Sequence, residues 1–167
     1  MTLYESKQSF PHSPFRWREY WQRTGLLFSP ELLCYFDGAC LPRNPGGHSS
    51  FGFAIFDKEK KIIKDGYKYL GVGDIFSNNL AEYEGLKAIF QYLIDNNLSE
   101  KNVVVMGDSM LVIKQMCGRW NIKGGLYANS AFECLKMKQQ IPNAYFKWIP
   151  REQNEYCDIL ADTAIKE

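Results

Sequence analysis

The stretch LLCYFDGACLPRNPGG, from Leu32 to Gly47, decides how the rest of the chain is organised. It opens with a short apolar run that ends at Phe36 and predicts a buried central strand. The first charge in the stretch is Asp37, where we expect the strand to end, and a turn rich in glycine and proline comes next. Because α/β proteins usually hold ligands at the carboxyl ends of buried strands, Asp37 is the first candidate for chemistry.

The composition is that of one ordinary globular domain. The chain has 167 residues, of which 46% are hydrophobic and 23% charged. The formal net charge is only +1, so a nucleic-acid partner would have to be held by a local patch. The five cysteines are dispersed, with no CxxC pair, which favours a reducing compartment over a disulfide framework or a zinc site. Without an apolar signal core or a run of membrane-spanning length, we expect a cytoplasmic protein with no membrane partner.

Residues 1–30 differ in character from the rest of the chain, and they predict an extension ahead of a main domain over 31–167. Trp17, Tyr20 and Trp21 share one face if their segment is helical, and arginines occupy another face. The segment is either a basic and aromatic arm that contacts nucleic acid or an amphipathic helix that packs its rings on the main domain. The two alternatives are compatible with each other.

The order of elements after residue 30 predicts an α/β domain. Strands ending near Asp37 and covering 50–56 and 62–70 are joined by short turns, which is typical of an antiparallel meander. The elements expected next are a helix over about 80–94, a strand over 103–106, a helix opened by 107–109, a helix over 128–139, a strand over 144–149 and a helix over 155–165. This order favours a mixed sheet with helices on its faces.

Three further acids stand where they could meet Asp37. Asp108 ends an apolar strand, so parallel neighbouring strands would present both acids at one edge of the sheet. Glu82 lies in line with the apolar stripe of its helix, where an acid is expensive to bury without a counter-charge. Asp158 sits near the start of the last helix, beside its buried face. Clustered carboxylates are the oxygen ligands that Mg²⁺ or Mn²⁺ prefers, and two ions that share them suit phosphodiester hydrolysis.

Each acid also has a purely structural explanation. Asp37 and the glycine after it form a common hairpin-turn dipeptide. Asp108 and the serine after it form a good helix N-cap pair. Glu82 and Asp158 lie in early turns of helices, where acids favour the helix dipole. Four acids on elements that can meet at one sheet edge nevertheless favour a shared site.

Four blocks of sequence carry recognisable motifs: DGAC with NPGG at 37–40 and 44–47, SNNLAEYEGL at 77–86, GDSMLVIKQM at 107–116, and WIPREQNEYCDILA at 148–161. Together they resemble the type 1 ribonuclease H family, in the family's order, from about Glu31 to Ile165. The resemblance implies a ribonuclease H-like fold, a five-stranded mixed sheet in the order 3-2-1-4-5 with helices on both faces. It also implies an endonuclease that cuts the RNA strand of RNA/DNA hybrids, leaving 5′-phosphate and 3′-hydroxyl ends. We expect the protein to be a monomer.

By this resemblance the family's four carboxylates fall on Asp37, Glu82, Asp108 and Asp158, which would hold two Mg²⁺ or Mn²⁺ ions. Asp37 would bridge both ions. Glu82 and Asp108 would complete the site of the ion that activates water, and Asp158 would help to hold the ion at the leaving 3′ oxygen. Candidates to contact the 2′-hydroxyl groups and phosphates of the hybrid are Cys40 (through its backbone), Asn44, Ser77, Asn78, Asn79 and Glu82.

The chain departs from the family at three places. Arg151 stands where many bacterial members carry a loop histidine, as in archaeal-type relatives; it could clamp phosphate or hasten metal release, but its guanidinium cannot act as a base at neutral pH. Met110 replaces a polar residue that often contacts the minor groove. The long basic protrusion is missing, and the shortened loop around Trp120 and Lys123 is either a reduced patch for phosphates and stacking or an ordinary loop.

Two rival functions make different predictions. A proofreading-type exonuclease has four acids on a related sheet but expects a second acid two residues after the first, whereas Gly38 and Ala39 come after Asp37. A non-catalytic module that binds hybrids or RNA predicts the loss of at least one carboxylate, and all four are present. The sequence favours the nuclease.

Overall fold

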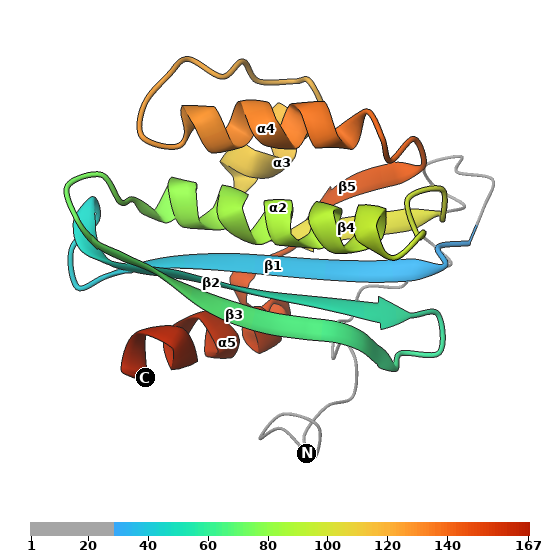
Figure 1. Cartoon of the computed structure of the whole chain (residues 1–167), viewed down its shortest axis with the longest axis horizontal. Coiled ribbons are helices and arrows are strands. Elements are labelled where there is room, and N and C mark those ends of the chain that lie inside the picture. The colour runs from blue at the N-terminus through green and yellow to red at the C-terminus, as the bar shows by residue number, and fades with distance from the viewer. Residues whose placement is uncertain (1–28) are drawn as a thin grey trace.

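A five-stranded mixed sheet lies at the centre of the structure (Figure 1), a computed structural model that describes residues 29–167. The strands have the order β3-β2-β1-β4-β5, so the expected sheet is confirmed. Three of them form an antiparallel meander: β1 (Leu32–Leu41), β2 (Gly46–Asp57) and β3 (Ile62–Gly73). The other two join it in parallel: β4 (Val103–Gly107) and β5 (Ala144–Trp148).

Helices cover both faces of the sheet, as Figure 1 shows. On one face α2 (Asn78–Asp95) packs on β1 and β2, and α4 (Ala128–Lys138) packs on α2. A short helix, α3 (Met110–Met116), comes after β4 on the same side. The opposite face is covered by α5 (Glu155–Lys166), which comes after the 3₁₀ turn η1 (Arg151–Gln153).

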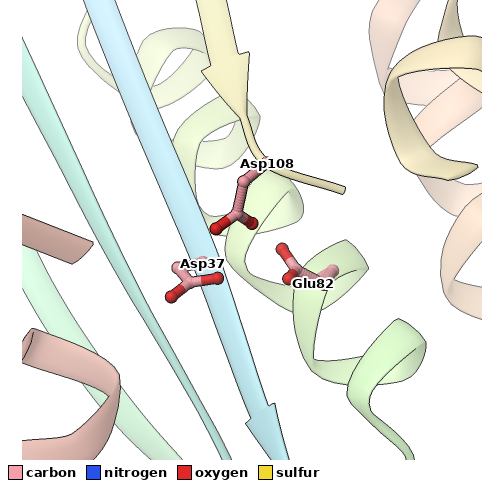
Figure 2. Close-up of side chains that lie close together, drawn as sticks. All are labelled: Asp37, Glu82 and Asp108. Carbon is pink, nitrogen blue, oxygen red and sulfur yellow. The ribbon is translucent and has the colours of Figure 1, made fainter. Parts of the chain in front are cut away.

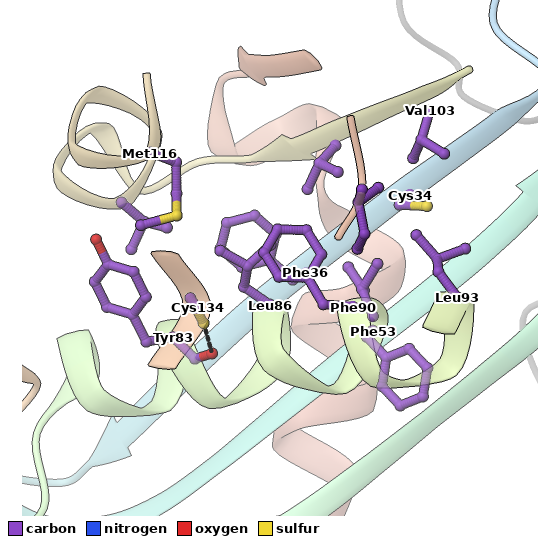
Figure 3. Packing of buried hydrophobic residues seen from close by; sticks show 14 of the residues in the cluster. Cys34, Phe36, Phe53, Tyr83, Leu86, Phe90, Leu93, Val103, Met116 and Cys134 are labelled. Atoms are coloured by element: carbon purple, nitrogen blue, oxygen red, sulfur yellow. Dashed lines mark hydrogen bonds between the residues drawn. The ribbon is translucent and has the colours of Figure 1, made fainter. Parts of the chain in front are cut away.

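The central strand β1 is buried on both faces, which explains its continuous apolar run. Cys34 and Phe36 point into a core with residues of α2 such as Leu86 and Phe90 (Figure 3). The alternate residues of β1 contribute to a second, smaller core beneath α5. The strand therefore holds its side chains rigidly on both sides up to the position of the first acid.

One strand boundary differs from the sequence prediction. We expected β1 to end at Asp37, but the strand continues to Leu41 because its antiparallel ladder with β2 goes on. The parallel ladder with β4 stops earlier, at the pair of Tyr35 and Met106. Asp37 therefore lies inside a strand, at the point where the pairing with β4 has just ended. The hairpin-turn explanation for Asp37 is wrong.

The expected N-terminal extension falls almost wholly on residues 1–28, which lie outside the described residues, as does the amphipathic helix expected within it. The remaining helices and strands begin and end within a few residues of their predicted bounds. None of the helices between residues 29 and 167 has the length and apolar character needed to cross a lipid bilayer.

Candidate active site

Carboxylates from three separate elements meet beside the middle of β1 (Figure 2). Asp37 comes from β1, Glu82 from α2, and Asp108 from the residue directly after β4. Each offers one oxygen, and these oxygens all lie within 4.8 Å of one another. Asp37 and Glu82 are almost completely buried, with exposed fractions of 4% and 2%. The structure thus brings together three of the four acids that the sequence singled out.

Two glycines allow helices on opposite faces of the sheet to come close to Asp37. A Cβ atom at Gly38 would lie 2.4 Å from the backbone nitrogen of Glu82, so only glycine lets α2 approach β1 so closely. Gly52 is paired directly with Asp37 across the β1–β2 ladder. A Cβ atom there would lie 2.6 Å from the carbonyl oxygen of Cys157 in α5. The small residues bring α2 and α5 within reach of the same acid.

Local hydrogen bonding leaves the acidic side chains available. The hydroxyl of Ser109 caps α3 by accepting a hydrogen bond of 3.2 Å from the backbone N–H of Val112. Since Ser109 does the capping, the Asp108 side chain is not needed for it and joins the carboxylate cluster instead. Ser77 caps α2 in the same way, accepting from Leu80 N–H at 3.1 Å.

The electrostatics of the cluster are those of acids that lack a sufficient counter-charge. Burial raises the pKa of Asp37, and the negative charges of Glu82 and Asp108 raise it further. The pKa of Glu82 is raised by burial and then by the charge of Asp108. Burial also raises the pKa of Asp108, although the charge of Arg151 partly offsets the effect. A bound cation would favour the ionised forms of all three acids.

The donor set fits a divalent metal ion. Every ligand atom offered by the cluster is a carboxylate oxygen, the donor type preferred by Mg²⁺ and Mn²⁺. The Oε2 atom of Glu82 is buried and has no hydrogen-bond partner among residues 29–167. A buried acceptor without a donor is costly, and a metal ion would satisfy it.

Asp158 and Arg151 line the same cavity, which has a volume of about 430 Å³, but they lie at its rim. Asp158 in α5 is half-buried and is not one of the three clustered acids. The Nη2 atom of Arg151 lies 3.6 Å from Oδ1 of Asp158, and the Arg151 side chain is 79% exposed. An ion pair of this length at an exposed position is weak, so Arg151 can turn to another anion.

The residues expected to contact substrate fall into two groups. Cys40 and Asn78 line the cavity, and Asn44 binds Asn78 because its Oδ1 accepts the Asn78 backbone N–H at 2.9 Å. The Cys40 thiol donates to the carbonyl oxygen of Arg43 at 3.2 Å, so its side chain is already engaged. This arrangement joins the loop after β1 to the N-terminus of α2.

The second group lies outside the cavity. Ser77 and Asn79 are half-buried at the start of α2, where Ser77 acts as the cap. Trp120 and Lys123 are exposed in the segment between α3 and α4. These two residues do not line the cavity that holds the carboxylates.

Sequence reasoning missed Asn154, Trp148 and Asp162. Trp148 and Asp162 line the cavity, and the Trp148 Nε1–H donates to the backbone oxygen of Asp108 at 3.1 Å. Asn154 is 1% exposed, and its Nδ2 donates to the backbone oxygen of Phe36, directly before Asp37, at 2.8 Å. In the sequence Asn154 looks like an ordinary turn residue ahead of a helix, and no local signal indicates its contact with β1.

Comparisons with known proteins agree with this geometry. Residues 35–164 match the family model described as reverse transcriptase-like. A bifunctional protein of Mycobacterium tuberculosis is 34% identical over 89 residues, which cover 53% of this chain and 24% of that protein. A ribonuclease HI of Halobacterium salinarum is 27% identical over 133 residues, covering 80% of this chain and 63% of that protein. The chain thus spans about a quarter of the length of the first of these relatives.

Solved structures of RNase H1 proteins have the same fold as this chain. The crystal structure of RNase H1 from Halobacterium salinarum superposes with a TM-score of 0.71 at 27% identity, covering 81% of this chain and 97% of that one. The RNase H1 named LC11, solved in complex with an RNA/DNA hybrid, superposes with a TM-score of 0.72 at 29% identity. That match covers 81% of this chain and 96% of the LC11 chain.

Proposed function

The chain belongs to the reverse transcriptase-like family and has the type 1 ribonuclease H fold, and from this we propose that it hydrolyses the RNA strand of RNA/DNA hybrids. The products would be 5′-phosphate and 3′-hydroxyl ends. The observation that carries the proposal is the convergence of Asp37, Glu82 and Asp108 within 4.8 Å in an open cavity. A purely structural domain gains nothing from burying three acids against one another.

We propose Mg²⁺ or Mn²⁺, with two ions in each site, as the cofactor. When bound, the ions would supply an activated water and stabilise the negative charge of the leaving oxygen. Asp37 would contribute to both positions, with Glu82 and Asp108 beside one and Asp158 beside the other. The buried Oε2 of Glu82, which lacks a donor among the described residues, supports this assignment.

Arg151 would bind phosphate at the rim of the cavity. Its weak pairing with Asp158, at 3.6 Å, can be exchanged for a substrate oxygen at little cost. Because a guanidinium stays protonated at neutral pH, Arg151 would act as a fixed positive charge and not as a proton shuttle. By holding Asp158 when no substrate is present, Arg151 would also compete with metal for that carboxylate.

Discrimination between RNA and DNA would come from the loop after β1 and the N-terminus of α2. Cys40 through its backbone, with Asn44, Asn78 and Asn79, would contact the 2′-hydroxyl groups and nearby phosphate. The hydrogen bond from Asn78 N–H to Asn44 Oδ1 supports a joint role for the two segments. Ser77 would help as the cap of α2, since backbone N–H groups at a helix N-terminus attract anions.

Trp120 and Lys123 would form a separate patch for stacking and phosphate. Both are exposed in the segment between α3 and α4, where an aromatic ring and an ammonium group can reach a nucleic-acid strand. Because they lie outside the cavity, they would add affinity for the hybrid without taking part in its cleavage.

We further propose that residues 31–167 act as a monomer in the cytoplasm, with residues 1–30 as an accessory extension. The five cysteines are all unpaired, and Cys117 is exposed, which suits a reducing compartment. Deleting residues 1–28 tests the extension: a loss of hybrid affinity that depends on salt would indicate an arm that contacts phosphates.

The function is tested with an end-labelled RNA/DNA hybrid incubated with Mg²⁺ or Mn²⁺. Single-stranded RNA and duplex DNA of the same sequence serve as controls for specificity. We expect the RNA strand of the hybrid alone to be cut, and Asp37→Asn to remove the activity. A hybrid that stays intact with either metal, or an Asp37→Asn protein that cuts as fast as the wild type, would refute the proposal.

A further inference from the structure

Asn154 occupies the N-cap position of α5 but does not cap the helix. An asparagine at this position ordinarily accepts a hydrogen bond from a backbone N–H in the first turn. In this structure the Asn154 side chain makes no capping bond to α5. Its Nδ2 donates instead to the backbone oxygen of Phe36 in β1, at 2.8 Å and fully buried. The Asn154 side chain thus joins the start of α5 to β1, a strand that lies far away in the sequence.

The accepting carbonyl lies just beyond the point where the pairing of β1 with β4 ends, although the pairing of β1 with β2 continues. Pairing between β1 and β4 ends with Tyr35 and Met106, one residue before Phe36. The next residue after Phe36 is Asp37, one of the three clustered acids. The amide of Asn154 therefore holds the backbone just before Asp37, immediately beyond the last residue paired with β4.

The backbone of Asn154 is tied to the other side of the site. Its carbonyl oxygen accepts the N–H of Asp158 at 3.1 Å, which fixes the helical turn that carries this acid. Its N–H donates to the carbonyl oxygen of Arg151 at 2.9 Å, which closes the 3₁₀ turn. One residue thus connects the segment of Asp37 with those of Asp158 and Arg151 through three hydrogen bonds.

The arrangement is expensive for folding alone. The Oδ1 atom of Asn154 is buried and accepts no hydrogen bond from residues 29–167. Leaving a buried polar atom unsatisfied destabilises the folded protein, because the atom loses its hydrogen bonds to water and gains none. A side chain chosen only for stability would either cap α5 or be apolar. The half-satisfied amide is explained if its donor is needed at the Phe36 carbonyl.

We propose that Asn154 is a positioning residue that sets the distance between Asp37 and Asp158 and thereby the affinity of the site for divalent metal. The inference rests on the metal site of the proposed function. Asn154 touches neither metal nor substrate, and it acts through the backbone on both sides of the cavity. Partners of this kind, behind the ligands themselves, are worth about 10- to 100-fold in metal affinity.

The test is calorimetric titration of the metal-free, full-length chain with Mg²⁺, without nucleic acid. Asn154→Leu removes the N–H donor at similar volume, and we expect its Mg²⁺ dissociation constant to rise about 10- to 100-fold. The matched control is Tyr156→Phe, which removes the hydroxyl that donates to Asp65 on β3. This change loosens the same turn of α5 but leaves the bond to Phe36 in place, so Mg²⁺ affinity should be retained.

Wild-type affinity in Asn154→Leu would overturn the inference. An equal loss in Tyr156→Phe would also overturn it, because docking of α5 would then be the cause. If the leucine variant does not fold, Asn154→Ser replaces it in the test. The serine side chain is too short for its hydroxyl to reach the carbonyl of Phe36, so the same rise in the Mg²⁺ dissociation constant is expected, and wild-type affinity would again overturn the inference. The titration contains no hybrid and measures only Mg²⁺ affinity. Its outcome is therefore independent of the cleavage assay, which tests the proposed function.

Discussion

Replacing Asp37 with asparagine should make the metal-free protein more stable. The substitution keeps the shape of the side chain and removes one of three ionisable carboxyl groups whose oxygens lie within 4.8 Å of one another and whose charges would repel. Asp37 is 4% exposed, so water screens little of this repulsion. The residue proposed to be central to activity is thus expected to oppose folding until metal binds.

The magnitude can be worked from the geometry. Two unit charges 4.8 Å apart, the upper limit of the separations within the cluster, repel by about 3 kcal/mol at an effective dielectric constant of about 20. The raised pKa values of Asp37 and Glu82 mean that protonation already relieves part of this repulsion. We therefore expect the free energy of unfolding to rise by about 1–3 kcal/mol. For a chain of this length that raises Tm by about 3–10 °C.

The gain should depend on pH. The folded-state pKa of Asp37 is raised to about 11, first by burial and then by the charge of Glu82, whereas an unfolded aspartate titrates near about pH 4. Between these values the folded protein binds more protons than the unfolded chain, so metal-free stability falls as pH rises. The advantage of Asp37→Asn should therefore be small at about pH 4–5 and larger at about pH 8.

The assay is thermal unfolding in the presence of a chelator at both pH values. Glu100→Gln, an exposed acid ahead of β4 at the far end of that strand from Asp108, is the control and should shift neither curve. Excess Mg²⁺ should raise the Tm of the wild type and leave Asp37→Asn nearly unchanged. An Asp37→Asn protein that is no more stable at high pH, or equally stabilised at both pH values, would contradict the reasoning.

Three other substitutions test the surroundings of the site. Gly38→Ala should lower the free energy of unfolding by about 1–3 kcal/mol, because the added Cβ atom would lie 2.4 Å from the backbone nitrogen of Glu82. It should also weaken metal binding in calorimetry. The control Gly85→Ala, whose Cβ atom would lie 3.4 Å from its nearest neighbour, should have a smaller effect on stability and on metal binding. Arg151→Ala should slow hybrid cleavage about 10- to 100-fold, which corresponds to the loss of one hydrogen bond to a charged group. The pH dependence of the cleavage rate should not shift, because Arg151 is proposed to act as a fixed positive charge. A shifted pH–rate profile would contradict that role. Gln115→Leu should lower the free energy of unfolding, measured with denaturant, by about 1–3 kcal/mol. The buried Gln115 side chain accepts a hydrogen bond from Tyr83 in α2 and donates to Asn121 and Tyr127 in the segment after α3. Unchanged stability would show that these hydrogen bonds do not stabilise the fold.

Much of the fold could be predicted from the chain because its signals are local. Apolar alternation and helical spacing reflect neighbours a few residues away, and they located the strands and helices to within a few residues. The acids were also recognisable, because Glu82 stands in a stripe that is otherwise apolar and Asp108 comes directly after a buried strand. Sequence alone thus determined the elements, their order and the residue types available for chemistry.

Only the tertiary structure decided how these parts meet. The end of β1 was mispredicted because it depends on the ladder with β2, in which Asp37 pairs with Gly52, and a ladder is specified by pairing between strands and not by spacing within one. The role of Asn154 depends on the carbonyl of Phe36, 118 residues distant in sequence. A hydrogen bond between distant segments leaves no periodic trace in either one. Its partner is chosen by the packing of a helix on a strand, and that packing exists only in the folded chain.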